Sequence, residues 1–489
     1  MTAFIAANLA PLMFAAMIVF LLLGYPVAFA LAANGILFGL IGIELGLLDA
    51  SLFQALPQRI WGVMSNETLL AVPFFTLMGL ILERSGMAED LLDTVGRLFG
   101  RRRGGLAYAV VFVGALLAAT TGVVAASVIS MGLIALPIML RYGYDRRLAA
   151  GAIAASGTLA QIIPPSLVLI ILADQLGRSV GDMYAGALVP GLALAGLYLL
   201  YVAGAAIVRP QWAPALPEAA LAPEPALQLA RRVVFVLLPP LALIFLVLGT
   251  IFLGVATPTE GGAMGATGAL LMAVARRRLT LKLLGQALDS TTRISAFVLF
   301  ILIGARVFSL TFYGVGGHLW VEHLLGDLPG GALGFLIVVN ALIFLLAFFL
   351  DFFELAFIVV PLLAPVAALL GIDLVWFGVL LAVNMQTSFM HPPFGFALFY
   401  LRSVAPAQDY VDPVTGALVA KVTTGQIYWG AVPFVLIQLL MVAAVIAFPE
   451  LVGWGLDDAH SADIGTIDIP IPESADDEVF WPEGSEVPN

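Results

Sequence analysis

Five ionisable side chains lie within otherwise apolar stretches of this sequence and are the first candidates for chemistry: Glu83, Glu260, Arg306, Asp351 and Glu354. A charged group in such surroundings is costly, so these positions are functional hypotheses by default. Arg306 lies within FILIGARVFSLTF, and its guanidinium could hold a carboxylate through two parallel hydrogen bonds. The alternative that we favour is an internal ion pair between Arg306 and Asp351 or Glu354.

Two of these acidic residues have simpler explanations. Glu260 follows Pro258 at an expected helix start, where a carboxylate suits the helix dipole, so capping explains it at least as well as a binding role. Glu83 is followed by Arg84 and is expected to be an interfacial charge. The sequence contains no Walker A, HExxH or GxSxG pattern, so we expect no ATP hydrolysis, no enzymatic activity, no catalytic residue and no cofactor.

Small polar residues precede a pair of adjacent prolines at two places in the chain. Ser156, Gly157 and Thr158 precede Pro164-Pro165, and the run from Asn384 to Thr387 precedes Pro392-Pro393. Because proline cannot continue a helical hydrogen-bond ladder, each pair predicts a helix break with free backbone carbonyls. The structural alternative is that the small residues only permit close helix packing.

The two breaks belong to an internal repeat with an offset of 228 residues. At this offset Pro137 matches Pro365, and the paired prolines match each other. The same offset aligns Gly143 with Gly371 and Asp145 with Asp373. Matches of Pro, Gly and Asp at one offset indicate a duplicated chain, which must be recognised before the fold is interpreted.

Composition defines the class of protein. The 489 residues are 62% hydrophobic and 11% charged, with a mean hydropathy of +1.06, whereas soluble domains are roughly 25% charged. Apolar runs of about 18 or more residues recur along the chain, which is the length that a bilayer core requires. We therefore predict a polytopic, all-α membrane protein. The chain has no cysteine, so disulfides and thiolate metal sites are excluded.

The basic residues predict the orientation of the spans. Clusters at Arg101–Arg103, Arg146-Arg147 and Arg276–Arg278 are expected in the cytoplasm. The block Leu106–Leu140 lies between two of these clusters and is therefore predicted to be a re-entrant hairpin with its tip at Thr120-Thr121-Gly122. The block Ala332–Leu370 is predicted to be a second hairpin that enters from the opposite side, with its tip near Asp351.

This reading gives about ten spans and two hairpins in two inverted repeats, with both termini outside. Such inverted repeats with broken helices are the architecture of secondary transporters. The predicted units are scaffold helices (1–103), first hairpin and broken helix (104–182), scaffold helix and linker (183–232), second scaffold group (233–331), second hairpin and broken helix (332–405), last span (406–448) and a disordered acidic tail (449–489).

At the level of motifs the chain resembles the large membrane subunit of tripartite ATP-independent periplasmic (TRAP) transporters, the DctM-like family. The resemblance rests on LPIMLRYGYD, SGTLAQIIPPS, ATPTEGGAMGA and LDFFELAFIVVPLLAPVAALLGIDLVWFGVLLAVNMQTSFMHPPFGFALF. It extends from about residue 5 to about residue 450. It implies an elevator-type carrier in the bacterial inner membrane that imports a small organic acid, such as a dicarboxylate, together with Na+.

The resemblance also implies two partners. They are a small four-helix membrane subunit and a periplasmic substrate-binding protein. Because the chain begins directly with the large-subunit pattern, we expect the small subunit to be a separate polypeptide. The basic clusters at Arg101 and Arg276 are expected to determine topology and to contact anionic lipid, and not to bind nucleic acid.

The resemblance implies one sodium site in each half. In the first half it implies the hairpin tip and the positions Ala160, Ile163 and Pro165, to which the small residues at the tip and before the break add Thr121, Gly122, Ser156, Gly157 and Thr158. In the second half it implies Ala347, Ser388, His391 and Phe394, to which the tip and the polar run before the break add Asp351, Asn384 and Thr387. Ala347 stands where the family often has Gly, and His391 where it often has Thr. An imidazole can titrate near neutral pH, so proton coupling is an alternative.

Two other functions remain open from the sequence. The first is an ion-translocating subunit of a membrane enzyme complex, and the second is a stand-alone carrier coupled to protons or sodium.

Overall fold

The computed structural model describes residues 2–122, 124–217, 225–392 and 395–453. The helices before the linker are α1 (Thr2–Ala7), α2 (Leu9–Leu22), α3 (Val27–Glu44), α4 (Leu56–Met64), α5 (Ala71–Arg84), α6 (Met87–Phe99), α7 (Gly105–Thr121), α8 (Val124–Arg141), α9 (Arg146–Thr158), α10 (Leu167–Leu176) and α11 (Val180–Val208). Those after it are α12 (Ala226–Phe252), α13 (Pro258–Ala275), α14 (Leu281–Gly314), α15 (Gly317–Gly326), α16 (Gly331–Leu346), α17 (Phe352–Glu354), α18 (Val360–Leu369), α19 (Leu374–Met385), α20 (Phe396–Val404), α21 (Thr424–Ala447) and α22 (Glu450–Gly453). The two short strands are β1 (Tyr410–Val411) and β2 (Leu418–Val419), which pair antiparallel.

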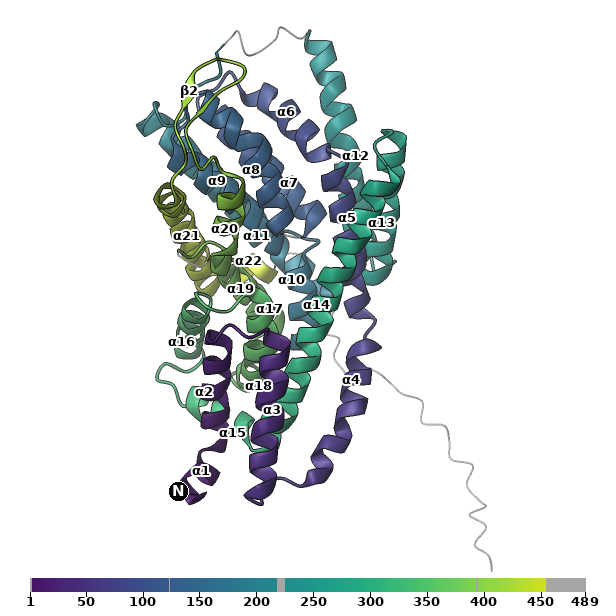
Figure 1. Cartoon of the computed structure of the whole chain (residues 1–489), viewed down its shortest axis with the longest axis vertical. Coiled ribbons are helices and arrows are strands. Elements are labelled where there is room, and N and C mark those ends of the chain that lie inside the picture. The colour runs from purple at the N-terminus through teal and green to yellow at the C-terminus, as the bar shows by residue number, and fades with distance from the viewer. Residues whose placement is uncertain (1, 123, 218–224, 393–394, 454–489) are drawn as a thin grey trace, which may run out of the picture.

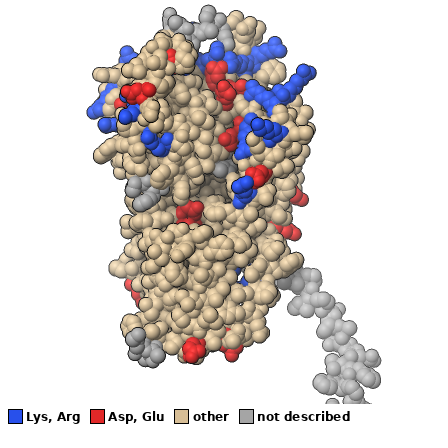
Figure 2. Space-filling view, in the orientation of Figure 1, with Lys and Arg blue, Asp and Glu red and all other residues tan. Residues whose placement is uncertain are grey.

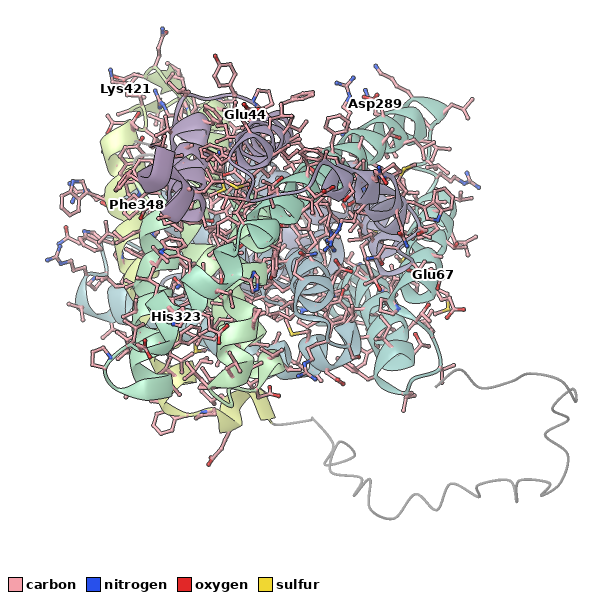
Figure 3. The ribbon with its side chains drawn as sticks, turned by 90° about the horizontal axis from the view of Figure 1, so that it is seen from below. Glu44, Glu67, Asp289, His323, Phe348 and Lys421 are labelled. Carbon is pink, nitrogen blue, oxygen red and sulfur yellow. The ribbon has the colours of Figure 1, made fainter. Side chains whose placement is uncertain are left out.

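The helices pack in two groups. In one, α14 packs along α3 and α5, and α13 packs along α5 and α12. In the other, α9 packs against α7, α8 and α21, while α19 packs against α10, α11 and α16. Figure 1 shows α12 and α13 along one side of the molecule and α9 and α21 along the other. Seen from below, Phe348 of the second group and Glu67, which precedes α5, lie on opposite sides (Figure 3).

The first predicted hairpin is present as α7 and α8. Gly122 ends α7 with a φ of +58°, in the left-handed region that glycine adopts without a steric penalty. A Cβ atom added to Gly122 would lie 3.6 Å from the Pro165 carbonyl oxygen and 3.5 Å from Leu167 Cγ. The hairpin therefore ends against the break of the helix that follows it.

The second hairpin is formed by α16 on one side and by α17, a π-helical turn at Leu355–Val359 and α18 on the other. Asp351 caps α17, so the chain reverses where the sequence placed the tip. A helix ends before Pro164 and another before Pro392, as predicted. A 3-10 turn at Leu159–Gln161 follows α9, and one at Gln386–Phe389 follows α19.

The repeated residues have the same structural role in both halves. Gly143 and Gly371 have φ values of +78° and +70° and end the second helix of each hairpin region. Asp145 and Asp373 then cap α9 and α19, because their carboxylates accept hydrogen bonds from backbone N–H groups of the first turn. The 228-residue repeat thus encodes one supersecondary unit, consisting of a hairpin, a tight turn and a capped broken helix.

Charge is distributed unequally between the two ends of the molecule. On the face in Figure 2, Lys and Arg atoms gather over the upper half, whereas acidic atoms mark the lower end. By length and composition, seven described helices can cross a membrane, and two bent helix pairs raise the number to nine. That count includes two hairpin arms, Val124–Arg141 and Phe352–Leu369, and it omits α2 and the broken helices α9–α10 and α19–α20, whose pieces are shorter, so its members are not the same as the ten spans predicted from hydropathy.

Four details differ from the sequence prediction. His318 and His323 lie on α15, a short helix between α14 and α16 that the hydropathy pattern does not predict. Helix α14 begins at Leu281, because Thr280 caps it through the N–H of Leu283, so it extends well before the apolar stretch around Arg306. The amphipathic helix α6 and the β1–β2 hairpin were not predicted, since their signals are not membrane-length hydropathy. Most of the acidic tail, residues 454–489, lies outside the described residues.

Candidate functional site

The two broken helices meet at residues that the repeat relates to each other. The side-chain amide of Gln386 donates to Thr158 Oγ1 at 3.0 Å, and these positions are separated by 228 residues. When equivalent residues of an inverted repeat touch, they lie close to the pseudo-two-fold axis that relates the halves. Both side chains are fully buried. The contact therefore marks the centre of the duplicated unit.

A small polar network surrounds this contact. Gln438 on α21 donates to the Tyr198 hydroxyl at 2.9 Å and approaches Thr158 Oγ1 at 3.4 Å. Tyr198 and Gln438 are fully buried. The network connects α9, α11, α21 and the turn after α19, and so it joins the first half of the chain to the second.

In the first half, the predicted residues gather around the break before Pro165. Ser156 and Thr158 donate to backbone carbonyls within α9, at 3.0 and 2.8 Å. Thr158 Oγ1 also accepts from Gln386 and Gln438, whereas the hydroxyl oxygen of Ser156 keeps its acceptor lone pairs. Ala160 and Ile163 are buried in the turn after α9. The side chain of Thr121 is not described, whereas the backbone of Gly122 lies against Pro165.

Gly157 faces the hairpin rather than the break. A Cβ atom added there would clash with Val128 on α8. Gly157 is thus required for close packing of α9 on α8, which supports the packing alternative for this one residue of the predicted set.

In the second half, the amide of Asn384 joins the broken helix to the hairpin. It donates to the backbone carbonyl of Asn340 at 2.8 Å and to its side-chain oxygen at 2.9 Å. Thr387 donates to the Asn384 carbonyl at 2.6 Å. Ala347 ends α16 and is buried. Phe394 lies outside the described residues.

His391 lies in an aromatic sandwich between the hairpin and the break. Its ring stacks on Phe348 with centroids 4.3 Å apart and meets Phe344 edge-on at 4.2 Å. The side chain is buried near the backbone of Ala347. His391 is therefore held by contacts with two aromatic rings of the second hairpin region.

Several buried oxygen atoms around the two breaks have no hydrogen-bond partner among the described residues. They are Gln161 Oε1, Asn384 Oδ1, Gln386 Oε1, Ser388 Oγ and Gln438 Oε1. An unsatisfied buried acceptor costs free energy, so each requires an explanation such as an ion or a water molecule. Neutral amide and hydroxyl oxygens are hard ligands of the kind that small hard cations prefer.

Within the described part of the chain, no ion pair joins Arg306 to Asp351 or Glu354, so the described residues do not show the internal pair that we favoured. Instead, Asp351 Oδ1 accepts from the Glu354 N–H at 3.1 Å, and Glu354 Oε2 accepts from the Asp351 N–H at 3.0 Å. The two carboxylates are occupied by this reciprocal capping box at the tip of the second hairpin.

Arg306 lies on the face of α14 that points to the second hairpin. Tyr313 follows it by seven residues, which places both on one side of a helix. The Tyr313 hydroxyl donates to the Pro361 carbonyl on α18 at 3.4 Å. Arg306 itself is half-buried.

The remaining two acidic residues have local partners. Glu260 and Thr257 form a capping box at the start of α13, as the capping interpretation predicted. Glu83 accepts a hydrogen bond from Ser130 on α8 at 2.8 Å and so joins the two packing groups. Its side chain is half-buried between α5 and α8.

Sequence reasoning missed Gln161 and Gln438 as members of the central site, and it named Gln386 without a role. The signal for Gln386 was available, because adding the repeat offset to Thr158 gives this position. Gln438 gives no such signal, since only packing of α21 on α9 brings it to Thr158.

Comparisons with known proteins agree with this architecture. Residues 14–451 match the family described as tripartite ATP-independent periplasmic transporter, DctM component. The chain is 33% identical to a C4-dicarboxylate TRAP transporter large permease protein from Pseudomonas aeruginosa, over 72% of this chain and 81% of that protein. It is 26% identical to a 2,3-diketo-L-gulonate TRAP transporter large permease protein from Escherichia coli, over 88% and 95% of the two chains.

A solved structure shares the fold. The YdaH transporter of Alcanivorax borkumensis superposes with a TM-score of 0.56 at 18% identity and covers 84% of this chain and 91% of that chain. These relatives are transport permeases and not enzymes, and the multi-pass architecture is that of a membrane protein. From its family match over residues 14–451, its duplicated broken helices and its paired hairpins, this chain belongs to the DctM component family of tripartite ATP-independent periplasmic transporters.

Proposed function

We propose that this chain is the permease subunit of a secondary transporter that imports a small organic acid together with Na+ by an elevator mechanism. One observation supports the proposal: two broken helices related by the repeat touch at Thr158 and Gln386, amid buried oxygens that have no hydrogen-bond partner among the described residues. Helix breaks at the centre of inverted repeats are where secondary transporters bind substrate and coupling ions.

The sodium sites use hard oxygens on each side of this contact. In the first half we propose the hairpin tip and the break, with the residues Thr121, Gly122, Ser156, Thr158, Ala160, Ile163 and Pro165. In the second half we propose the tip and the turn before Pro392, with Ala347, Asp351, Asn384, Thr387, Ser388, His391 and Phe394. The unpartnered oxygens of Gln161 and Gln386 extend these two sets.

Arg306 is the proposed partner of the substrate carboxylate. Its charge has no ion pair in the described residues, and its helix face looks toward the second hairpin. Leaving a half-buried guanidinium unpaired is costly, whereas a carboxylate ligand would satisfy it through a bidentate contact. Relatives named for a C4-dicarboxylate and for 2,3-diketo-L-gulonate both support a small carboxylate as the class of substrate.

The two packing groups suggest how the carrier moves. The group around α9 and α19 is held together by buried contacts between the halves, such as that of Gln386 with Thr158. The polar contacts between the two packing groups include the hydrogen bonds of Glu83 with Ser130 and of Asn66 with Asp174. Water can replace such hydrogen bonds when the groups move apart. We infer that the hairpins and broken helices move as one block against the scaffold formed by α3, α5, α13 and α14.

The family name implies the rest of the assembly. A periplasmic binding protein would deliver the substrate, and a small membrane subunit would brace the scaffold. The permease would lie in the bacterial inner membrane with both termini in the periplasm. On this view the binding protein selects the substrate, and the permease supplies the ion coupling.

The proposal is tested by uptake in proteoliposomes that contain this chain, its small subunit and its binding protein. A labelled C4-dicarboxylate is offered with an inward sodium gradient, with choline in place of sodium, and with an inward proton gradient alone. We expect uptake only with sodium and only with the binding protein. Uptake driven by protons alone would refute sodium coupling, and uptake without the binding protein would refute the tripartite arrangement.

The role of Arg306 is tested separately. Arg306→Gln should raise the KM for the dicarboxylate at least tenfold, because one charge-assisted bidentate contact is lost. Arg293→Gln is the matched control, since Arg293 lies on the same helix and pairs with Asp289 on an exposed surface. Equal KM values for the two variants would show that Arg306 does not meet the substrate.

A further inference from the structure

An apolar groove on the outer side of α11 is not part of the proposed transport site. It encloses 840 Å³ between α7, α11 and α21. Its floor is one face of α11 that includes Leu197, Leu200 and Ala203, and its walls include Phe112 and Met441. We call this surface the α11 groove.

The opposite face of α11 contacts the transport site. Gly191 packs against the break, because an added Cβ atom would lie 3.2 Å from Ile163 Cγ1 and 3.3 Å from the Ile162 carbonyl oxygen. Tyr198 reaches Gln438 in the central polar network. The α11 groove is thus separated from the site by the thickness of one helix, about 10 Å.

The length of the groove matches one leaflet of a bilayer. Its floor extends from Ala193 to Ala203, which is about 15 Å along a helix with a rise of 1.5 Å per residue. That length is half of a hydrocarbon core about 30 Å thick. Leu200 is 67% exposed and Phe112 is 40% exposed, so apolar surface remains uncovered within the described chain. An acyl chain is the occupant that this length and surface fit.

The end of the groove nearest the α6–α7 turn is basic. Arg102 and Arg103 line it and are exposed. Neither has an ion pair among the described residues, whereas Arg276 and Arg278 of the other basic cluster both pair with Asp90. The guanidinium groups of Arg102 and Arg103 therefore lie at the end of the α11 groove without an acidic partner in the described chain.

The turn that carries these arginines is held in place by the linker between the halves. The N–H of Gly104 donates to the Ala213 carbonyl, and the N–H of Leu216 donates to the Gly100 carbonyl, both at 2.9 Å. Gly104 has a φ of +79°, which glycine adopts without strain. These hydrogen bonds therefore hold the basic end of the α11 groove in a defined position.

We propose that the α11 groove binds an anionic diacyl phospholipid from the leaflet at the basic end of the molecule. One acyl chain lies along α11, and the headgroup phosphate meets Arg102 and Arg103. A zwitterionic phospholipid fits the slot equally well but offers less net negative charge to the two arginines.

The test uses the full chain with its small subunit in nanodiscs of phosphatidylcholine, titrated with fluorescent phosphatidylglycerol. We expect saturable binding that Arg102→Gln combined with Arg103→Gln weakens about thirtyfold, since each basic side chain contributes to anionic-lipid affinity. The matched control combines Arg101→Gln with Arg277→Gln, which removes the same charge outside the groove. A second variant, Leu200→Trp, should fill the slot and weaken binding without changing charge.

Four results would overturn the proposal. Fluorescent phosphatidylcholine could bind as tightly as phosphatidylglycerol, or the control pair could weaken binding as much as the groove pair. Glycerol phosphate could displace the lipid at equal concentration, which would mark a free-phosphate site. A cross-link from Leu200→Cys to the small subunit in the assembled complex would instead make the α11 groove a subunit interface.

Discussion

Replacing Gln386 by leucine is the sharpest test of the central site. The two side chains are similar in volume, so the substitution leaves little cavity. It removes the hydrogen bond to Thr158 at 3.0 Å and also removes Oε1, a buried acceptor without a partner in the described chain. If Oε1 is a sodium ligand, stability and ion binding must respond differently to the same change.

The cost in stability is expected to be small. An interhelical hydrogen bond in a membrane protein contributes about 0.6 kcal/mol on average and up to about 1.7 kcal/mol. Thr158 retains its own donation to the Ala155 carbonyl and the 3.4 Å approach of Gln438. Loss of the unpartnered Oε1 offsets part of the cost. We therefore expect the free energy of unfolding to fall by about 1 kcal/mol.

The effect on sodium binding is expected to be larger. A ligand at one hundred times its Kd stabilises the folded state by about 2.7 kcal/mol. The assay compares thermal unfolding midpoints in NaCl and in choline chloride at equal ionic strength, for wild type and for Gln386→Leu. We expect the sodium-dependent rise in Tm to be mostly lost in the variant, together with sodium-driven uptake.

Gln438→Leu is the matched comparison for this experiment. It removes the same amide from the same network but leaves the Tyr198 hydroxyl without its donor. It should therefore lower stability, by about 1–3 kcal/mol, and retain the sodium-dependent rise in Tm. If Gln386→Leu keeps the full sodium effect, or if both variants lose it equally, the assignment of Gln386 Oε1 to a sodium site is refuted.

Three further predictions follow from single contacts. Gly122→Ala should lower uptake, because it strains the left-handed backbone (φ +58°) at the hairpin tip that lies against Pro165, whereas Gly177→Ala, which has a similar φ of +62° but no atom within 4 Å of the added Cβ, should only lower Tm. Burial raises the pKa of Asp412, but hydrogen bonds from its neighbours, including Arg141, outweigh this and hold the pKa below its ordinary value. The stabilisation is therefore present above about pH 4 and lost as pH falls through the lowered pKa, so the Tm of Asp412→Asn should depend less on pH between 7 and 3. Ser130→Ala should remove the hydrogen-bond donor of the Glu83 carboxylate and so speed the movement of the two packing groups relative to each other. Single-molecule measurements of the distance between the groups would record this movement, and an unchanged rate would count against a moving interface at Glu83.

The sequence determined the architecture because its signals are strong and local. Membrane-length apolar runs, clusters of arginine and two proline pairs each act through general rules of helix length, topology and backbone hydrogen bonding. The repeated Gly143 and Asp145 could be interpreted in the same way, since a left-handed turn and a helix cap require those residue types at those positions. The two hairpins and two broken helices followed from these signals.

Only the tertiary structure decided which side chains share the site. Arg306 was expected to pair with Asp351 or Glu354, but those carboxylates bind each other's backbone, and a capping box cannot be distinguished from an ion pair by hydropathy alone. The packing of α21 on α9 places Gln438 beside Thr158, although the two residues are 280 positions apart in the sequence. The spacing of residues along a helix or within a repeat can be determined directly from the sequence, whereas contacts between helices depend on how the helix surfaces pack. The sequence therefore specified the breaks, and the fold selected the oxygens that surround them.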